Sequence, residues 1–134
     1  MSFEIVSDSD VMKITLRGAF NSLELVKLFE AVQAREMQLA RSPHRITDLS
    51  AAAGPQLTQT DIIHAVQRIR SVRYLNEHKS AIVAPSLIQY GFARMFQMLN
   101  DHPQVVVGVF RDMESAEVWL ATKEEQLVSS SGLQ

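Results

Sequence analysis

Regular alternation of apolar and polar residues is clearest near the start of the chain. Every second residue is apolar across 11–17, beginning with Met12, and this period-two pattern is typical of a half-buried strand. The short apolar segment 3–6 precedes it, and the polar cluster 7–10 between the two is typical of a turn. We therefore expect residues 3–6 and 11–17 to form an antiparallel hairpin.

Later segments repeat their apolar residues every three or four positions, which is the pattern of an amphipathic helix. Asn21 is the expected N-cap of the first helix, which the pattern continues to about Ala40. Thr58 and Asp61 have the spacing of a capping box, and the helix that they begin continues toward Tyr74. The expected helices cover residues 21–40, 58–74, 86–99 and 112–120.

Three apolar runs between these helices predict further strands at 45–49, 79–84 and 105–110. The order ββαβαβαβα indicates an α/β fold with a mostly parallel sheet of about five strands and four helices, in two or three layers. The opening hairpin adds an antiparallel edge strand. We expect residues 1–122 to form a single domain, and residues 123–134 to be the helix end and a frayed C-terminal tail.

Composition narrows the class of protein. A net charge of −2 provides no overall positive field, so nucleic acid is not an expected partner. The chain contains no cysteine, which excludes disulfides, thiolate metal sites and a cysteine nucleophile. Neither a signal peptide nor a membrane span is recognisable, because the apolar runs are too short. We therefore expect a cytoplasmic protein.

Catalytic motifs are missing from the sequence. None of the histidines (His44, His64, His78 and His102) has a metal-ligand spacing to another. There is no glycine-rich phosphate loop and no Gly-x-Ser-x-Gly nucleophile elbow. The sequence thus predicts a non-catalytic protein without a metal or other cofactor.

One candidate site follows the predicted strand 45–49. Asp48 lies at the C-terminal end of a parallel strand, where open α/β sheets bind their ligands. Ser50, Thr58 and Thr60 are the nearest hydroxyls, and together these residues are a candidate ligand or partner loop. The alternative is local: Asp48 caps its own loop, and Thr58 is an ordinary helix cap.

The helix 86–99 is the second candidate, because it is apolar over more of its circumference than one sheet face can cover. Gly91 inside it costs about 1 kcal/mol relative to alanine, which a close helix–strand contact or a position lining a pocket would explain. The alternative is thick core packing. The residues proposed to form an apolar interface or pocket are Tyr90, Phe92, Met95, Phe96 and Met98.

The order of elements over residues 3–121 resembles the SpoIIAA-like fold, which STAS domains and anti-sigma-factor antagonists share. Ala81–Ser86, Tyr90–Phe96 and Val109–Asp112, followed by Ala116 and Trp119–Leu120, are more particularly similar to the STAS/SEC14-type branch, which consists of short bacterial chains.

The resemblance implies two functions. Anti-sigma-factor antagonists carry a phosphorylatable serine where this chain has Thr58 and Thr60, but the Ser-Ser-Gly-like run is absent here. We therefore expect a non-catalytic protein-interaction or regulatory module that self-associates through the helix 86–99 or 58–74. The SEC14-type relatives imply the alternative, a small apolar, lipid-like ligand bound between the helix 86–99 and the sheet.

Overall fold

The structure, a computed structural model, describes residues 2–8, 10–53 and 57–122. The predicted tail 123–134 and residues 54–56 of the predicted loop lie outside the described residues. The strands are β1 (Ser2–Ser7), β2 (Val11–Gly18), β3 (His44–Ala52), β4 (His78–Val83) and β5 (Val105–Phe110). The helices are α1 (Ser22–Glu36), α2 (Gln59–Arg70), α3 (Leu87–Leu99) and α4 (Met113–Ala121).

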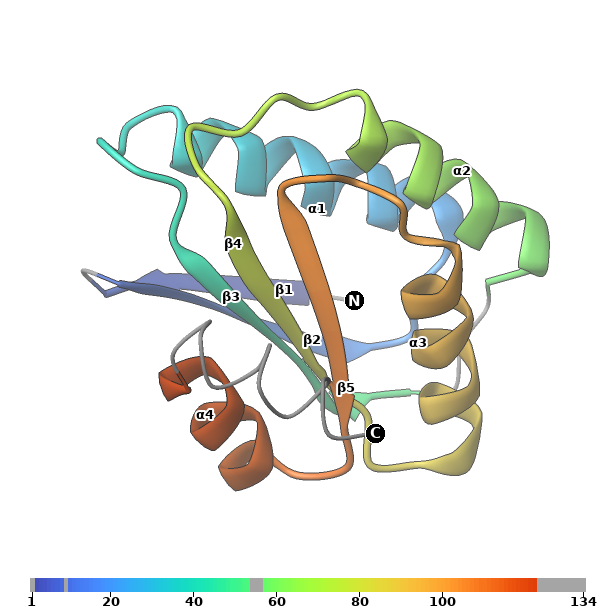
Figure 1. The fold of residues 1–134 in the computed structure, drawn as a ribbon. Helices are drawn as coiled ribbons and strands as arrows, with labels where there is room; N and C mark the ends of the chain where they lie inside the picture. The colour runs from blue at the N-terminus through green and yellow to red at the C-terminus, as the bar shows by residue number, and fades with distance from the viewer. Residues whose placement is uncertain (1, 9, 54–56, 123–134) are drawn as a thin grey trace.

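The strands form one mixed sheet in the order β1-β2-β3-β4-β5. β1 is antiparallel to β2, and every other neighbouring pair is parallel. Because the parallel strands follow one another in sequence, right-handed crossovers place α1, α2 and α3 on the same face. α4 packs on the opposite face, against β3, β4 and β5 (Figure 1). The predicted α/β architecture with an antiparallel edge strand is confirmed, in three layers.

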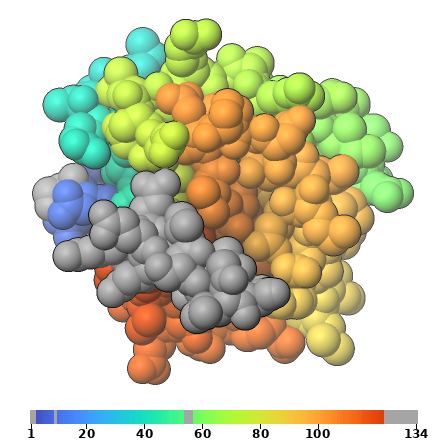
Figure 2. Space-filling view, in the orientation of Figure 1, coloured from blue at the N-terminus to red at the C-terminus, as the bar shows by residue number. Residues whose placement is uncertain are grey.

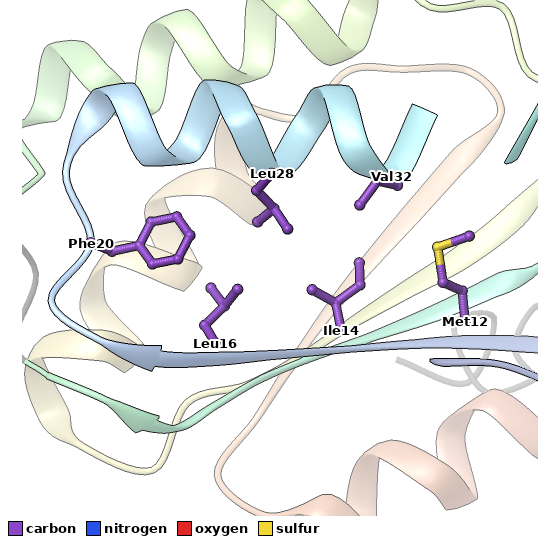
Figure 3. Close-up of a cluster of buried hydrophobic side chains, with 6 residues drawn as sticks. All are labelled: Met12, Ile14, Leu16, Phe20, Leu28 and Val32. Atoms are coloured by element: carbon purple, nitrogen blue, oxygen red, sulfur yellow. The ribbon is translucent and has the colours of Figure 1, made fainter. Parts of the chain in front are cut away.

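Each face of the sheet has its own core. Met12, Ile14 and Leu16 point from β2 toward α1, where they meet a cluster that includes Leu28 and Val32 (Figure 3). The other face, which we call the α4 face, packs a second cluster of side chains with exposures between 0% and 9%. That cluster consists of Ile46, Ala81, Val83, Ala116 and Leu120.

Two helices end earlier than their apolar pattern predicts. α1 ends at Glu36 rather than Ala40, because the next residues form tighter turns with hydrogen bonds to the carbonyl three positions back. These turns bring Leu39 against the cluster of Met12, Ile14 and Leu16. α2 ends at Arg70, where the Ser71 hydroxyl donates to the carbonyl of Arg68. Tyr74 is therefore not helical.

β3 is longer than predicted because it contains a bulge. Between the pairs Thr15–Asp48 and Arg17–Ala51 the register shifts, so β3 contributes one residue more than β2. Asp48 Oδ1 accepts both the backbone N–H of Ser50, at 3.0 Å, and its hydroxyl, at 2.5 Å. This local bonding stabilises the bulge.

α3 covers the outer edge of β5. Gln97 Nε2 donates to the carbonyl of Val107 at 2.9 Å, and Asn100 Nδ2 donates to that of Val105 at 3.0 Å. These carbonyls point away from β4, so α3 occupies acceptors that a further strand would need. In Figure 2, α3 (gold) lies at the surface beside β5 (orange).

Candidate functional site

An apolar hollow lies between the sheet and the three helices on its face. This three-helix cavity has a volume of about 190 Å³. Apolar side chains from strands β2 to β4 and from all three helices form most of its wall. They include Leu16, Phe20, Leu25, Leu28, Phe29, Leu49, Leu57, Ile62, Ala65, Ile69, Ile82, Phe92, Ala93 and Phe96.

Residues on β4 differ in burial according to the face on which they lie. Ala81 and Val83, on the α4 face, are 0% and 2% exposed. Ile82 between them points into the three-helix cavity and is only half-buried, although its strand lies inside the sheet. The α4 side is therefore tightly packed around Ala81 and Val83, whereas the three-helix side is incompletely packed over β3 and β4.

The floor of the cavity carries three neighbouring polar side chains. Arg45 and Thr47 are two positions apart on β3, and Ser80 is the partner of Arg45 on β4. Their side chains therefore lie side by side on the same face. Within the described part of the chain, neither the Thr47 nor the Ser80 hydroxyl takes part in a hydrogen bond. Both hydroxyls can thus accept a further partner.

Arg45 is paired with a carboxylate from α1. Its Nη2 lies 2.5 Å from Glu36 Oε2, and the two side chains are only 13% and 11% exposed. The guanidinium also stands over the Tyr74 ring, at 5.2 Å from its centroid. Burial raises the pKa of the Tyr74 hydroxyl. The charge of Arg45 is therefore balanced within the protein.

Gln89 connects the first turn of α3 to the end of β3. The Ser86 hydroxyl accepts the Gln89 N–H, and Gln89 Oε1 accepts the Ser86 N–H, which completes a capping box. Gln89 Nε2 donates to the carbonyls of Leu49 and Ala52 at 2.9 and 3.0 Å, across the bulge of β3. Gln89 is not among the predicted site residues, although the Ser-x-x-Gln spacing is the signal of such a box.

The predicted apolar set on α3 points in several directions. Phe92 and Phe96 line the cavity. Tyr90 is half-buried, with the Arg111 guanidinium 5.4 Å from its ring centroid. Met95 is half-buried, whereas Met98 is 76% exposed and lies outside the cavity. The predicted pocket residues also omit the contributions of α1 and α2.

The predicted loop residues do not converge. Asp48 lies on the α4 face beyond Ile46, whereas Thr58 begins α2 on the opposite face. Thr58 Oγ1 accepts the Asp61 N–H at 3.2 Å, and Asp61 Oδ2 accepts the Thr58 N–H at 2.8 Å. Thr60 is exposed in the first turn of α2. The strand order also lacks the reversal that opens a ligand crevice at the carboxyl ends. A ligand or partner role for these four residues stays a prediction.

A second hollow, of about 570 Å³, opens near the start of β3 and β4 on the α4 side. Its wall includes charged side chains of both signs, among them Asp10, Arg41 and Glu117. His44 also lines it, and burial lowers the pKa of this imidazole, with Lys79 contributing. Water solvates the charged groups of this wall well, whereas a predominantly apolar hollow gains free energy when it is filled. The three-helix cavity is therefore the better candidate site.

A buried aromatic and histidine cluster lies at the same end of the sheet. The Tyr74 ring centroid is 4.6 Å from that of His78 and 5.1 Å from that of His102. Burial, with the Arg45 charge as a second cause, lowers the pKa of His78 to about 4. Within residues 2–8, 10–53 and 57–122, no three His, Asp or Glu side chains are grouped closely enough for a metal ion.

Comparisons with known proteins identify the fold. No family model matches the sequence, and no curated protein matches it either. One similar structure is an uncharacterised protein of the DUF3478 family from Shewanella loihica PV-4, described as having a SpoIIAA-like fold. The identity is 12% and the TM-score 0.58, over 90% of this chain and 93% of the other.

Another similar structure is the anti-sigma factor antagonist SpoIIAA in its unphosphorylated form. The identity is 11% and the TM-score 0.53, over 87% of this chain and 94% of that one. Crossing a bilayer would need a longer and more apolar helix than any in the described part of this chain. The strand order, the helix placement and both similar structures agree that the chain has a SpoIIAA-like fold.

Proposed function

We propose that this protein is a non-catalytic module that binds a small apolar molecule in the three-helix cavity. The observation that carries the proposal is the cavity itself, about 190 Å³ lined mainly by apolar side chains. It lies where the resemblance to SEC14-type proteins places a ligand, between α3 and the sheet, but α1 and α2 close it as well.

The free energy of an empty cavity supports a binding role. At about 24 cal/mol per Å³, a fully enclosed cavity of 190 Å³ would cost roughly 4–5 kcal/mol of stability, and this hollow, which is partly open to solvent, costs part of that. Even part of it is sizeable beside the 5–15 kcal/mol that typically stabilises a domain. A ligand that fills the space returns part of this free energy, because its apolar surface leaves water.

The volume limits the size of the ligand. An apolar cavity of about 150 Å³ accommodates benzene in another protein. The present cavity is slightly larger, so it suits a substituted benzene or a short alkyl chain of about seven to nine non-hydrogen atoms. A whole membrane lipid is far too large for it.

Toluene is a suitable first probe. We expect toluene to bind the wild-type protein saturably in calorimetric titrations, and to raise its unfolding temperature in a concentration-dependent way. In an Ala93→Leu variant, whose added methyl groups enter the cavity, binding should be lost. Absence of toluene binding by the wild-type protein, or equal binding by the variant, would contradict the proposal.

Self-association through α3 is the second candidate function. Leu87 and Met98 share one face of α3, and Ile88 and Leu99 share the adjacent face. Their exposures of 78%, 76%, 62% and 43% leave apolar side chains open to solvent at both ends of the helix, on either side of the exposed Arg94. Gly91 lies between these ends, and a Cβ there would meet nothing within 4 Å. A second copy of α3 is the occupant that we propose, because the glycine allows two helices to approach closely.

By contrast, α2 is a weaker candidate for an interface, because Ile63 is the only large apolar side chain that this helix exposes. Light scattering during size-exclusion chromatography tests the assignment. We expect a dimer that Met98→Glu converts to a monomer and that Ile63→Glu, the matched control on α2, leaves unchanged. A monomer at high wild-type concentration would refute self-association, and dissociation by the control alone would refute the α3 interface.

A further inference from the structure

We infer that the cavity selects uncharged ligands that carry one hydroxyl or carbonyl group on an apolar body. The inference rests on the proposed ligand-binding function and specifies its chemical class. It follows from the juxtaposition of Thr47, Ser80 and Arg45 on the cavity floor, where Arg45 is paired with Glu36 of α1.

The hydroxyls of Thr47 and Ser80 provide the polar contact. They come from adjacent strands and line the same part of an otherwise apolar wall. In the described part of the chain neither hydroxyl has a hydrogen-bond partner. A hydroxyl both donates and accepts, so it can serve a ligand hydroxyl or carbonyl equally well.

Their position relative to the apolar wall orients the ligand. Thr47 and Ser80 belong to the sheet, whereas Phe92, Phe96 and Ala93 face it from α3. A ligand that bonds to the floor therefore places its apolar body against the helices. A hydrocarbon fits the same walls but leaves both hydroxyls unpaired, which costs affinity relative to a ligand that satisfies them.

The charges around the floor exclude an ionised head group. Arg45 would attract a carboxylate, but Glu36 already lies 2.5 Å from its guanidinium and neutralises it. A ligand carboxylate would add an unbalanced negative charge beside an ion pair that is already neutral. An ammonium group would add an unbalanced positive charge beside Arg45. Because the charges of Arg45 and Glu36 balance each other, the site favours a ligand with a neutral polar group.

Four probes that share one aromatic ring separate these possibilities: toluene, benzyl alcohol, benzoate and benzylammonium. We expect benzyl alcohol to bind at least as tightly as toluene, although it is the better hydrated of the two in water. Benzoate and benzylammonium should bind at least about tenfold more weakly than benzyl alcohol, because each loses its hydration without finding a free counter-charge.

Variants of the floor test the role of the hydroxyls. Thr47→Val and Ser80→Ala each remove one hydroxyl and keep an apolar side chain in place. In the double variant we expect the affinity for benzyl alcohol to fall about threefold to tenfold relative to that for toluene. Thr15→Val is the matched control, because Thr15 lies on β2 and does not line the cavity.

The outcomes distinguish the two claims. If none of the four probes binds the wild-type protein, the proposed function fails and this inference fails with it. If toluene binds more tightly than benzyl alcohol, the cavity is a purely apolar site and only the inference fails. The inference also fails if benzoate binds most tightly, or if the double variant leaves the ratio of benzyl alcohol to toluene affinity unchanged.

Discussion

Ala93→Leu should stabilise the protein, although enlarging a buried residue normally does the opposite. Ala93 is 5% exposed on α3 and lines the three-helix cavity. A leucine there adds three carbon atoms, which we expect to enter the existing space instead of displacing neighbours. The substitution also keeps a good helix former in the middle of the helix.

The expected gain can be worked from the cavity. Three carbon groups fill roughly 80 Å³, and at about 24 cal/mol per Å³ this recovers about 2 kcal/mol. Burying the added groups gives a similar figure, at about 0.8 kcal/mol each. Imperfect fit reduces both values, so we expect the free energy of unfolding to rise by about 1–2 kcal/mol.

Urea denaturation of the apo protein, with the m-value held constant, measures this change. Ala116→Leu is the matched control: Ala116 lies on α4, is 0% exposed, and packs in the filled cluster of the opposite face. There the same enlargement should cost about 1–3 kcal/mol. Equal destabilisation by both substitutions would refute the reasoning, because it would mean that the three-helix side is packed as densely as the α4 side.

Three further predictions concern other parts of the structure. His78 has a pKa of about 4 in the folded protein and 6.5 when exposed, so the unfolded chain binds more protons between these two pH values. The free energy of unfolding should therefore fall by about 2 kcal/mol as the pH is lowered from above 6.5 to 5. Urea titrations at each pH measure this loss, and it should shrink markedly in His78→Phe; an unchanged loss would contradict the assignment. Gln89→Leu should lower the free energy of unfolding by about 2 kcal/mol, because two carbonyls of β3 lose their hydrogen-bond donor. Amide hydrogen exchange at the end of β3 should also accelerate. Protection equal to that of the wild type would show that the Gln89 side chain is not needed there. Gly91→Ala should stabilise the monomer by about 0.5–1 kcal/mol, since within one chain a Cβ there meets nothing within 4 Å. Gly108→Ala should destabilise it, since its Cβ would lie 2.8 Å from the Phe110 ring and 3.0 Å from that of Trp119. Thermal melts of dilute, monomeric protein that show the reverse order would contradict both.

The pattern of the sequence predicted the architecture because the pattern reports burial directly. Period-two alternation located β2, and the continuous apolar runs located β4 and β5. Helices pack on β5 from both sides, although Val106 remains 56% exposed. The ends of elements were less predictable. Leu39 continues the apolar periodicity of α1, yet it reaches the core from a turn. The backbone of Tyr74 is held by two hydrogen bonds with the Gln104 side chain, 30 positions away in the chain.

The candidate site was only partly predictable from the sequence. The excess apolar surface of α3 was visible, and two of its members, Phe92 and Phe96, line the cavity. The interpretation of Gly91 was wrong, because no close contact or lining position explains it in this chain. The cavity floor could not be predicted, because the grouping of Thr47 with Ser80 depends on the register between β3 and β4.

NMR of alanine methyl groups can map directly where toluene binds. We expect saturable shifts at Ala65 and Ala93, which line the three-helix cavity, and none at Ala116 in the packed α4 cluster. Shifts that centre on Ala116, or no saturable shift at Ala65 and Ala93, would contradict binding in the three-helix cavity.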